Sequence, residues 1–195
     1  PPAAAALPAP PIVLPDFSQW GAVERKPVTK VRRITAERLQ ACWQTTPMVT
    51  QFDEADITDL EVWRKQYAPR VEKAGGKLTV TAVLLKVVGA ALRAHPQFNT
   101  SYDQAAGQII QKHYVHVGIA VDTPHGLLVP VVRNVDQKNV TQLAVELVEI
   151  AAKTRDRKVA PADMQGGSMT ITNVGTIGGT GFTPILNPPE VAILG

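Results

Sequence analysis

The sequence predicts an α/β fold in which helices flank a mixed β-sheet. Short β-branched runs typical of strands alternate with helical patterns, and the alternation is irregular, which favours a mixed sheet over a regular parallel one. An apolar share of 45% with 19% charged residues is ordinary for a globular protein. A chain of 195 residues is long enough for one domain with a tail.

A tail is set apart by its composition at the amino terminus. Residues 1–11 are five Pro, five Ala and one Leu, which cannot bury enough surface to fold and favour an extended polyproline II conformation. The segment is either a tail without consequence or a linker to another domain. We predict a Pro/Ala-rich linker over residues 1–16 and one globular domain over residues 17–195.

Four segments of this domain have helical patterns. Thr58-Asp-Leu-Glu61 has the spacing of a capping box, which predicts a helix that Gly75-Gly76 ends. A continuous apolar run predicts a buried helix that is stopped by Pro96. The expected helices cover residues 35–45, 58–73, 81–94 and the region around 143–151.

Five β-branched or alternating runs predict strands. Two of them are joined by Asp122-Thr-Pro-His-Gly126, which is a turn by composition. Another leads into residues 175–181, where four of seven positions are glycine, and glycine allows positive φ or a close approach of the backbone. The expected strands cover residues 49–57, 115–121, 127–132, 169–172 and 191–194.

Composition also argues against several classes of partner. The net charge is only +3 and no basic run is interleaved with aromatic residues, so we expect no nucleic acid. The longest apolar stretch, Val80 to Leu92, is interrupted by Lys86, so we expect no membrane span. The sequence has one cysteine, Cys42, so an internal disulfide is excluded and a reducing compartment is favoured. We expect Cys42 to be a buried residue of a helix.

The histidines indicate no metal site. None of the four stands at ligand spacing with cysteines or carboxylates. His113 and His116 are three apart in an expected extended segment, which places them on opposite faces. His125 lies in the predicted turn and could approach a ligand there, although a solvated loop histidine is the ordinary alternative.

Several separated stretches resemble, in the right order, the catalytic domain of the dihydrolipoamide acyltransferases, the E2 cores of 2-oxo acid dehydrogenase complexes. The resemblance implies the fold of chloramphenicol acetyltransferase, assembled as a homotrimer with active sites between subunits and then into a larger core. It implies a linker that carries a lipoyl domain, and E1 and E3 components as partners. The matching stretches are residues 49–58, 97–101, 118–132 and 166–195.

The reaction that the resemblance implies is transfer of an acyl group, acetyl in the most similar members, between dihydrolipoamide and coenzyme A. The reaction requires a base that makes a thiolate and a donor for the oxyanion. Met169-Thr-Ile-Thr172 stands where the family has Phe-Thr-Ile-Ser, so Thr172 takes the donor's place, although it is also a good strand residue. The family's His-x-x-x-Asp-Gly motif is absent, so we expect the catalytic base beyond the chain end and no activity from this chain alone.

Four further residues match positions that contact coenzyme A in the family. Arg64 and Lys86 would bind its phosphates, and Asp122 and Gly126 belong to a turn that lines the cofactor channel. Each has an ordinary alternative: Arg64 as a solvated helical residue, Lys86 as an amine whose flexible stem reaches water or a partner, and Asp122 as a residue that satisfies its own turn.

Three functions remain open. The chain is the catalytic core of an acyltransferase, or an E2-like scaffold without catalysis, or an unrelated α/β domain that binds a ligand. The missing motif and the replacement of serine by Thr172 suit the scaffold, whereas the apolar run at 191–194 favours a catalytic domain that lacks its C-terminal part. The resemblance implies a cytoplasmic location in bacteria and the mitochondrial matrix in eukaryotes.

Overall fold

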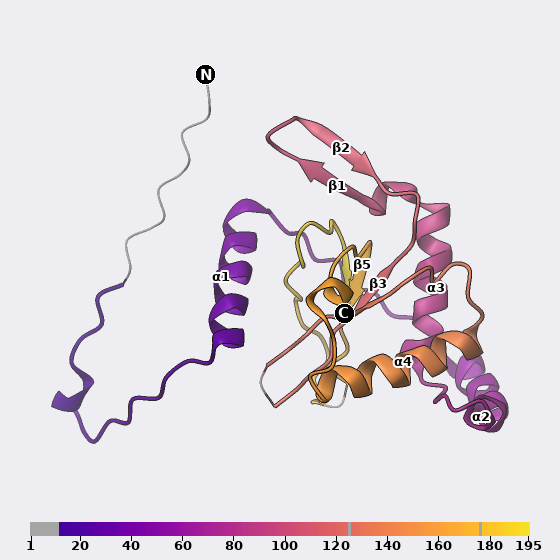
Figure 1. The fold of residues 1–195 in the computed structure, drawn as a ribbon, viewed down its shortest axis with the longest axis horizontal. Coiled ribbons are helices and arrows are strands. Elements are labelled where there is room, and N and C mark those ends of the chain that lie inside the picture. The colour runs from indigo at the N-terminus through magenta and orange to yellow at the C-terminus, as the bar shows by residue number, and fades with distance from the viewer. Residues whose placement is uncertain (1–11, 125, 176) are drawn as a thin grey trace.

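The computed structural model describes residues 12–124, 126–175 and 177–195 (Figure 1). Four α-helices, a four-stranded sheet and a separate two-stranded hairpin make up the described fold. The predicted linker residues 1–11 lie outside the described residues. The elements are η1 (Phe17–Gln19), α1 (Lys30–Thr45), α2 (Thr58–Lys73), α3 (Val80–Ala94), η2 (Pro96–Phe98), β1 (Thr100–Asp103), β2 (Gln108–Gln111), β3 (Val117–Ile119), β4 (Val131–Val132), α4 (Val140–Arg155), η3 (Pro161–Met164), β5 (Met169–Ile171) and β6 (Ile193–Leu194).

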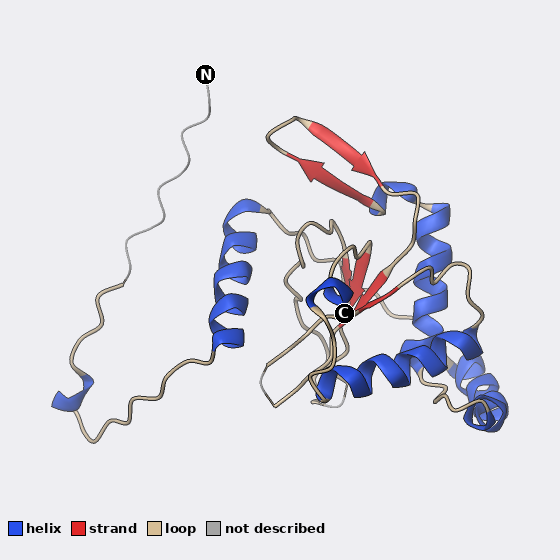
Figure 2. Ribbon diagram, in the orientation of Figure 1, coloured by secondary structure: helices blue, strands red, loops and turns tan. Residues whose placement is uncertain are grey.

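The sheet is mixed, as predicted. Its strand order is β4-β3-β5-β6, in which β3, β5 and β6 run parallel and β4 runs antiparallel to β3 (Figure 2). Val117 pairs with Met169 and Ile119 with Ile171, so β3 and β5 end at the same edge of the sheet. The antiparallel connection from β3 to β4 is the predicted turn, extended by a bridge between Val121 and Leu128.

Helices α3 and α4 cover one face of this sheet. Side chains alternate between the two faces of a strand, and Val117, Ile119 and Ile171 belong to the main hydrophobic cluster together with Leu85 of α3 and Leu143 of α4. The intervening residues of β3 and β5 therefore face the other side of the sheet. That second face is where the candidate site lies.

Local sequence explains why α3 and α4 form where they do. The Thr79 hydroxyl accepts a hydrogen bond from the Ala82 N–H at 3.2 Å, which caps α3. Asn139 and Gln142 form a reciprocal capping box at the start of α4. Gly89 lets α3 approach the loop after β4, because a Cβ there would lie 3.0 Å from Val135. Among the described residues, no helix is long and apolar enough to cross a membrane.

Residues 12–57 differ from the rest of the domain. Helix α1 begins at Lys30, earlier than the expected Thr35, because the Thr29 side chain caps it. Its one buried residue is Cys42, as predicted, whose thiol donates to the backbone oxygen of Leu186 at 3.4 Å. Residues 12–28 are exposed throughout and lie apart from the sheet and its helices (Figure 1).

Two predictions about local structure need correction, and one element was not predicted. Residues 49–57 form no strand; Val49 is 97% exposed and has no neighbouring strand to pair with. Helix α2 has the predicted bounds but not the capping box, because the Thr58 hydroxyl donates to Asp56 and the Glu61 carboxylate binds Arg64. The hairpin β1–β2 was not predicted, since every residue of β2 is exposed and its sequence shows no alternation.

Candidate active site

The candidate site lies at the edge where the three parallel strands end. Thr172 directly follows β5, and its N–H donates to the Leu194 oxygen of β6 at 2.8 Å. The Ala120 N–H, at the end of β3, donates to the Ile171 oxygen at 2.9 Å. Ligands of α/β proteins commonly bind outside the carboxyl ends of parallel strands. This edge therefore has the geometry of a binding site.

Thr172 presents an unused hydroxyl at this edge. It is partly exposed, and among the described residues none forms a hydrogen bond with its hydroxyl. Its neighbour Asn173 is fixed on two sides: the side-chain amide donates to the Thr81 hydroxyl of α3 at 3.3 Å, and its oxygen accepts from the Gly175 N–H at 2.8 Å. The backbone beside Thr172 is thus anchored, and its hydroxyl remains available to a ligand.

The predicted turn after β3 reaches the same edge. Asp122 is exposed, three residues beyond Ile119 at the end of β3. The Thr123 hydroxyl donates to the Gly126 oxygen at 2.6 Å, and Gly126 has a φ of 128°, which an L side chain rarely adopts. A Cβ at Gly126 would lie 3.6 Å from Val31, so the first turn of α1 lies beside this turn.

The glycine-rich loop begins at the same point. Gly178 and Gly179 have φ values of 97° and 116°, a conformation that explains glycine at both positions. A Cβ at Gly181 would lie 3.2 Å from the ring of Phe52, so the loop runs close to the segment before α2. The chain from Thr172 onward therefore turns back over the second face of the sheet.

Arg64 and Lys86 lie on α2 and α3, and each has partners within the chain. Arg64 forms a bidentate ion pair with Glu61, with Nε–Oε1 and Nη2–Oε2 distances of 2.7 and 2.8 Å. It also donates to the backbone oxygen of Leu78. Lys86 donates to the backbone oxygen of Asp136 at 2.8 Å. Among the hydrogen bonds and ion pairs of the described residues, none joins either cation to Thr172. Their role toward coenzyme A stays a prediction, and their structural role is visible.

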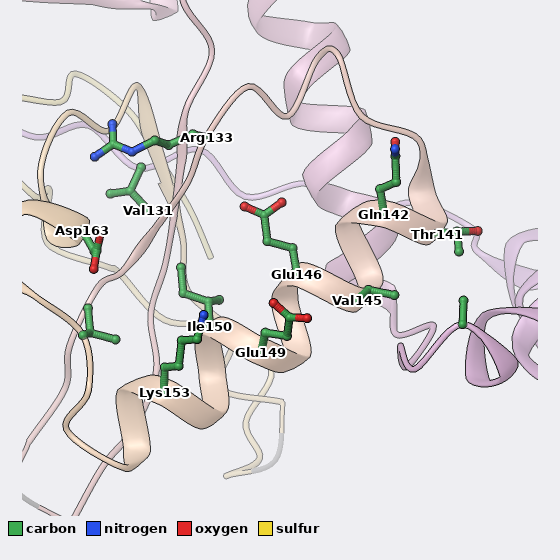
Figure 3. Close-up of a pocket in the computed structure, with 12 residues that line it drawn as sticks. Val131, Arg133, Thr141, Gln142, Val145, Glu146, Glu149, Ile150, Lys153 and Asp163 are labelled. Carbon is green, nitrogen blue, oxygen red and sulfur yellow. The ribbon is translucent and has the colours of Figure 1, made fainter.

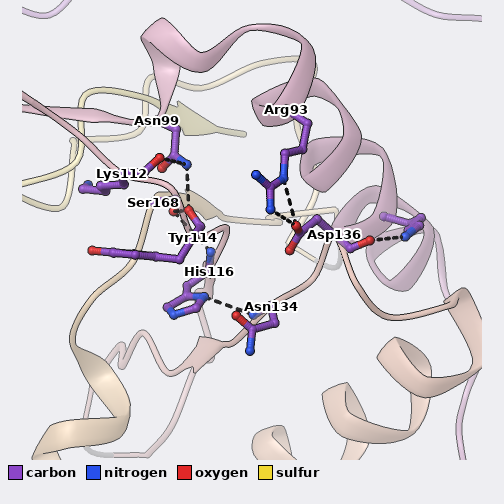
Figure 4. A network of polar contacts seen from close by, with 9 residues as sticks. Arg93, Asn99, Lys112, Tyr114, His116, Asn134, Asp136 and Ser168 are labelled. Carbon is purple, nitrogen blue, oxygen red and sulfur yellow. Dashed lines mark hydrogen bonds and ion pairs between the residues drawn. The ribbon is translucent and has the colours of Figure 1, made fainter.

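The described histidines lie away from Thr172. His116 precedes β3, so it lies at the opposite edge of the sheet, where its Nδ1 accepts a hydrogen bond from the Asn134 N–H at 3.0 Å (Figure 4). Burial lowers the pKa of His116, which favours this neutral state. His95 ends α3, a helix whose start is the part that contacts Asn173, about 20 Å away along its axis. His113 is exposed in the segment that follows β2, and His125 lies outside the described residues.

A second hollow in the surface lies away from the predicted site residues. A groove of about 640 Å³ runs along α4 beside the end of β4, with charges of both signs on its walls, among them Arg133, Glu149 and Lys153 (Figure 3). None of the predicted site residues lines it. Over the described ranges, no cluster of histidine, cysteine and acidic side chains has the arrangement of a metal site.

One buried charged residue was missed by the sequence interpretation. Glu190 is only 6% exposed and accepts hydrogen bonds from Thr170 and Asn187. Burial raises its pKa, while these two hydrogen bonds and the charge of Lys112 act in the opposite direction. Nothing in the local sequence Asn187-Pro-Pro-Glu190 indicates that its carboxylate is buried.

The fold and the arrangement of these residues define an α/β domain with a candidate ligand site at the ends of the parallel strands of a mixed sheet. The chain belongs to the 2-oxoacid dehydrogenases acyltransferase (catalytic domain) family, because the sequence model of that family matches residues 21–195. The predicted family membership is therefore confirmed.

Individual relatives agree with this assignment. The dihydrolipoyllysine-residue acetyltransferase component of the pyruvate dehydrogenase complex of Pseudomonas aeruginosa is 50% identical over 186 residues, which cover 95% of this chain and 34% of that protein. The chain thus spans about a third of the length of this curated relative. The solved dihydrolipoamide acetyltransferase of Azotobacter vinelandii matches with a TM-score of 0.92 and 50% identity over 95% of this chain and 76% of that one.

The cubic core of a pyruvate dehydrogenase multienzyme complex matches equally well, with a TM-score of 0.92, 50% identity and the same coverage. The predicted fold is confirmed by these neighbours, which are acyltransferase cores with the same mixed sheet and flanking helices.

Proposed function

We propose that this chain is the acyl-transferring core of a 2-oxo acid dehydrogenase complex and moves an acetyl group between dihydrolipoamide and coenzyme A. The observation that carries the proposal is the Thr172 hydroxyl, which is unpartnered among the described residues and lies where three parallel strands end. The family membership supplies the class of reaction. Coenzyme A and a lipoyl group on another domain are the proposed substrates.

Thr172 would act on the tetrahedral intermediate. The thiolate of one substrate attacks the carbonyl carbon of the acetyl thioester, a C–S bond forms, and the carbonyl oxygen takes the negative charge. The intermediate collapses when the original C–S bond breaks, and the departing thiolate takes up a proton. A hydrogen bond from the Thr172 hydroxyl to the oxyanion stabilises this intermediate by about 2.7–4 kcal/mol.

The base that makes the thiolate is proposed to lie outside these 195 residues. Of the described histidines, His95, His113 and His116 lie away from the strand ends, and His116 accepts a hydrogen bond at the opposite edge; His125 lies outside the described residues. On this proposal the chain alone transfers acetyl far below an ordinary enzyme rate of about 1 s⁻¹ or more. Turnover near that rate from the purified 195-residue chain would show that the base is within it.

The proposed assembly is a homotrimer that builds a larger core, with E1 and E3 components and a lipoyl domain as further partners. The exposed apolar side chains of residues 12–28 support it, because Val13 and Trp20 are 92% and 71% exposed, and the ring that Trp20 contacts is Phe17 of the same exposed segment. The buried thiol of Cys42 is consistent with the reducing compartment that we propose for the protein.

The test of Thr172 uses the full-length protein with acetyl-CoA and dihydrolipoamide. Thr172→Ala should lower kcat about 10²-fold or more with little change in KM, because the hydrogen bond is stronger in the transition state than in the ground state. Thr172→Ser keeps the hydroxyl and should retain activity. Thr141→Ala, at the start of α4, is the control and should change neither constant. A fully active Thr172→Ala variant would show that Thr172 is only a strand residue and that the oxyanion donor lies elsewhere, whereas an inactive unaltered protein would point to the scaffold function.

The test of Arg64 and Lys86 compares the two substrates. Coenzyme A is polyanionic, so Arg64→Ala and Lys86→Met should raise the KM for coenzyme A far more than the KM for dihydrolipoamide, and added salt should shrink the defect. Since both side chains also have structural partners, unfolding curves of both variants are needed alongside. Equal effects on both substrates would leave only the structural role.

A further inference from the structure

The carboxylate of Glu190 is buried on the sheet face toward which Thr172 projects. Thr170 donates its hydroxyl to Glu190 Oε2 at 2.7 Å, and the Asn187 amide donates to Oε1 at 3.2 Å. Thr170 and Thr172 are two residues apart at the end of β5, so both side chains project to the same face. The Thr170 hydroxyl therefore joins Glu190 to the strand segment that carries Thr172.

Two neighbouring backbone segments leave room for this pair. A Cβ at Gly167 would overlap Glu190 Oε1, and a Cβ at Gly118 would lie 2.7 Å from Thr170 Oγ1. Gly118 is the residue of β3 that pairs with Thr170, so the space belongs to adjacent strands of one sheet. The Ser101 hydroxyl donates to the Pro189 oxygen at 2.6 Å and fixes the segment that brings Glu190 in. The backbone is thus built around the carboxylate.

A charged group at this position lowers stability. Burial raises the pKa of Glu190, and the charged side chain that acts on it is Lys112, whose own pKa is lowered by burial and whose ammonium donates to the Gly167 oxygen at 3.2 Å. Because the folded-state pKa of Glu190 is raised, its contribution to stability is fully present below the unfolded pKa and is lost as the pH rises through the folded value. A neutral residue would avoid this loss.

The hydrogen bonds explain why a carboxylate is needed. Both groups that face Glu190, the Thr170 hydroxyl and the Asn187 amide, are donors here, and an ionised carboxylate accepts on both oxygens. Glutamine has one acceptor and one donor, so it can bond to both partners only if the Thr170 hydroxyl turns and accepts instead of donating, which reverses that hydrogen bond.

We propose that Glu190 is a positioning residue for acyl transfer: by holding the Thr170 hydroxyl it sets the place of Thr172 at the end of β5. The inference rests on the proposed function of Thr172. Misplacement of a reacting group by about 1 Å can cost about 10²-fold in rate, so a contact two residues away can matter without touching substrate.

The test measures kcat, both KM values and stability in the full-length protein. Thr170→Val and Glu190→Gln should each lower kcat about tenfold or more while both KM values stay within about twofold. Thr170→Ser keeps the hydroxyl and should stay within about threefold of unaltered kcat. The matched control is Thr154→Val, a fully buried threonine of α4 whose hydroxyl donates to Ile150, and it should leave kcat unchanged.

A second readout tests the buried carboxylate and its link to Thr170. Relative to the unaltered protein, Glu190→Gln should gain stability as the pH is raised from about 5 to about 8, because only the carboxylate ionises. The double variant Thr170→Val/Glu190→Gln should lose no more kcat than the more severe single variant, since both break one link. Should Glu190→Gln fail to fold, the contrast between Thr170→Val and Thr170→Ser decides alone.

The outcomes are distinct. An active unaltered protein whose Thr170→Val variant retains full kcat overturns the positioning role, and so does an equal loss of kcat in Thr154→Val. An inactive unaltered protein overturns the proposed function and this inference together.

Discussion

Residues 12–57 and residues 58–195 differ in where their apolar side chains lie. In the second region, Leu85 and Leu143 are fully buried between the helices and the sheet. In the first region, Val13 and Trp20 lie in solvent, and Cys42 is the one buried apolar residue among those described. Apolar composition therefore shows that a surface is to be buried, but not whether the partner surface lies in the same chain.

The two regions meet at a small contact. The Cys42 thiol donates to the Leu186 oxygen, and the Leu186 N–H donates to Met48 Sδ, both at 3.4 Å. Leu186 belongs to the segment that leads to Glu190, so α1 packs on the side of the sheet that carries the candidate site. We expect α1 to open without unfolding the rest, because few contacts hold it.

The largest effect is expected in the core of the second region. Leu85→Ala should lower the free energy of unfolding by about 2–5 kcal/mol, because Leu85 is 0% exposed and its removal leaves a cavity between α3 and the sheet. Denaturant titration of the variant and the unaltered protein gives the difference. A loss below about 1 kcal/mol would mean that the main hydrophobic cluster does not make residues 58–195 more stable than residues 12–57.

A smaller effect is expected at the contact between the regions. Cys42→Ala should cost about 1 kcal/mol, since it removes one buried sulfur. Amide hydrogen exchange should become faster in α1 and stay unchanged in α3. Faster exchange in both helices would show that residues 12–57 and 58–195 unfold as one unit, which contradicts the difference between the two regions.

The smallest effect on the stability of the single chain is expected in the exposed segment 12–28, here called the arm. Trp20→Ala should change the free energy of unfolding of the monomer by less than about 0.5 kcal/mol, because the side chain is 71% exposed. It should weaken self-association, measured by sedimentation. Tyr67→Ala is the contrasting control: its ring lies 5.0 Å from Trp63 within the chain, so it should lower stability and leave association intact. Unchanged association of Trp20→Ala would argue against the arm as a contact between subunits.

The helices could be predicted because their signals are local. The apolar run that ends before Pro96 identifies α3, whose last residue is Ala94, and the spacing of Leu143 and Leu147 identifies α4. The strand expected over 49–57 was wrong for the opposite reason. Val49 and Phe52 belong to a loosely alternating segment, but a strand exists only where another strand pairs with it.

The candidate site could be predicted in part. The resemblance pointed to Thr172, and the structure brings it to one edge with the turn that begins at Asp122. For Lys86 a partner within the chain was one of the alternatives considered, but the sequence did not say which group it is, and for Arg64 only a solvated position was considered. Only distances could reveal that these cations are already occupied.

By itself, then, the sequence determined the helices, the β3–β4 turn and, through its motifs, the family. Each depends on residues a few positions apart, whose caps, apolar spacing and turn chemistry act before the chain is compact. Only the tertiary structure decided that Gly118 lies beside Thr170 and that Glu190 enters the space between them. Pairing of parallel strands joins segments separated by a long crossover, so burial of the Glu190 carboxylate depends on packing that no local pattern encodes.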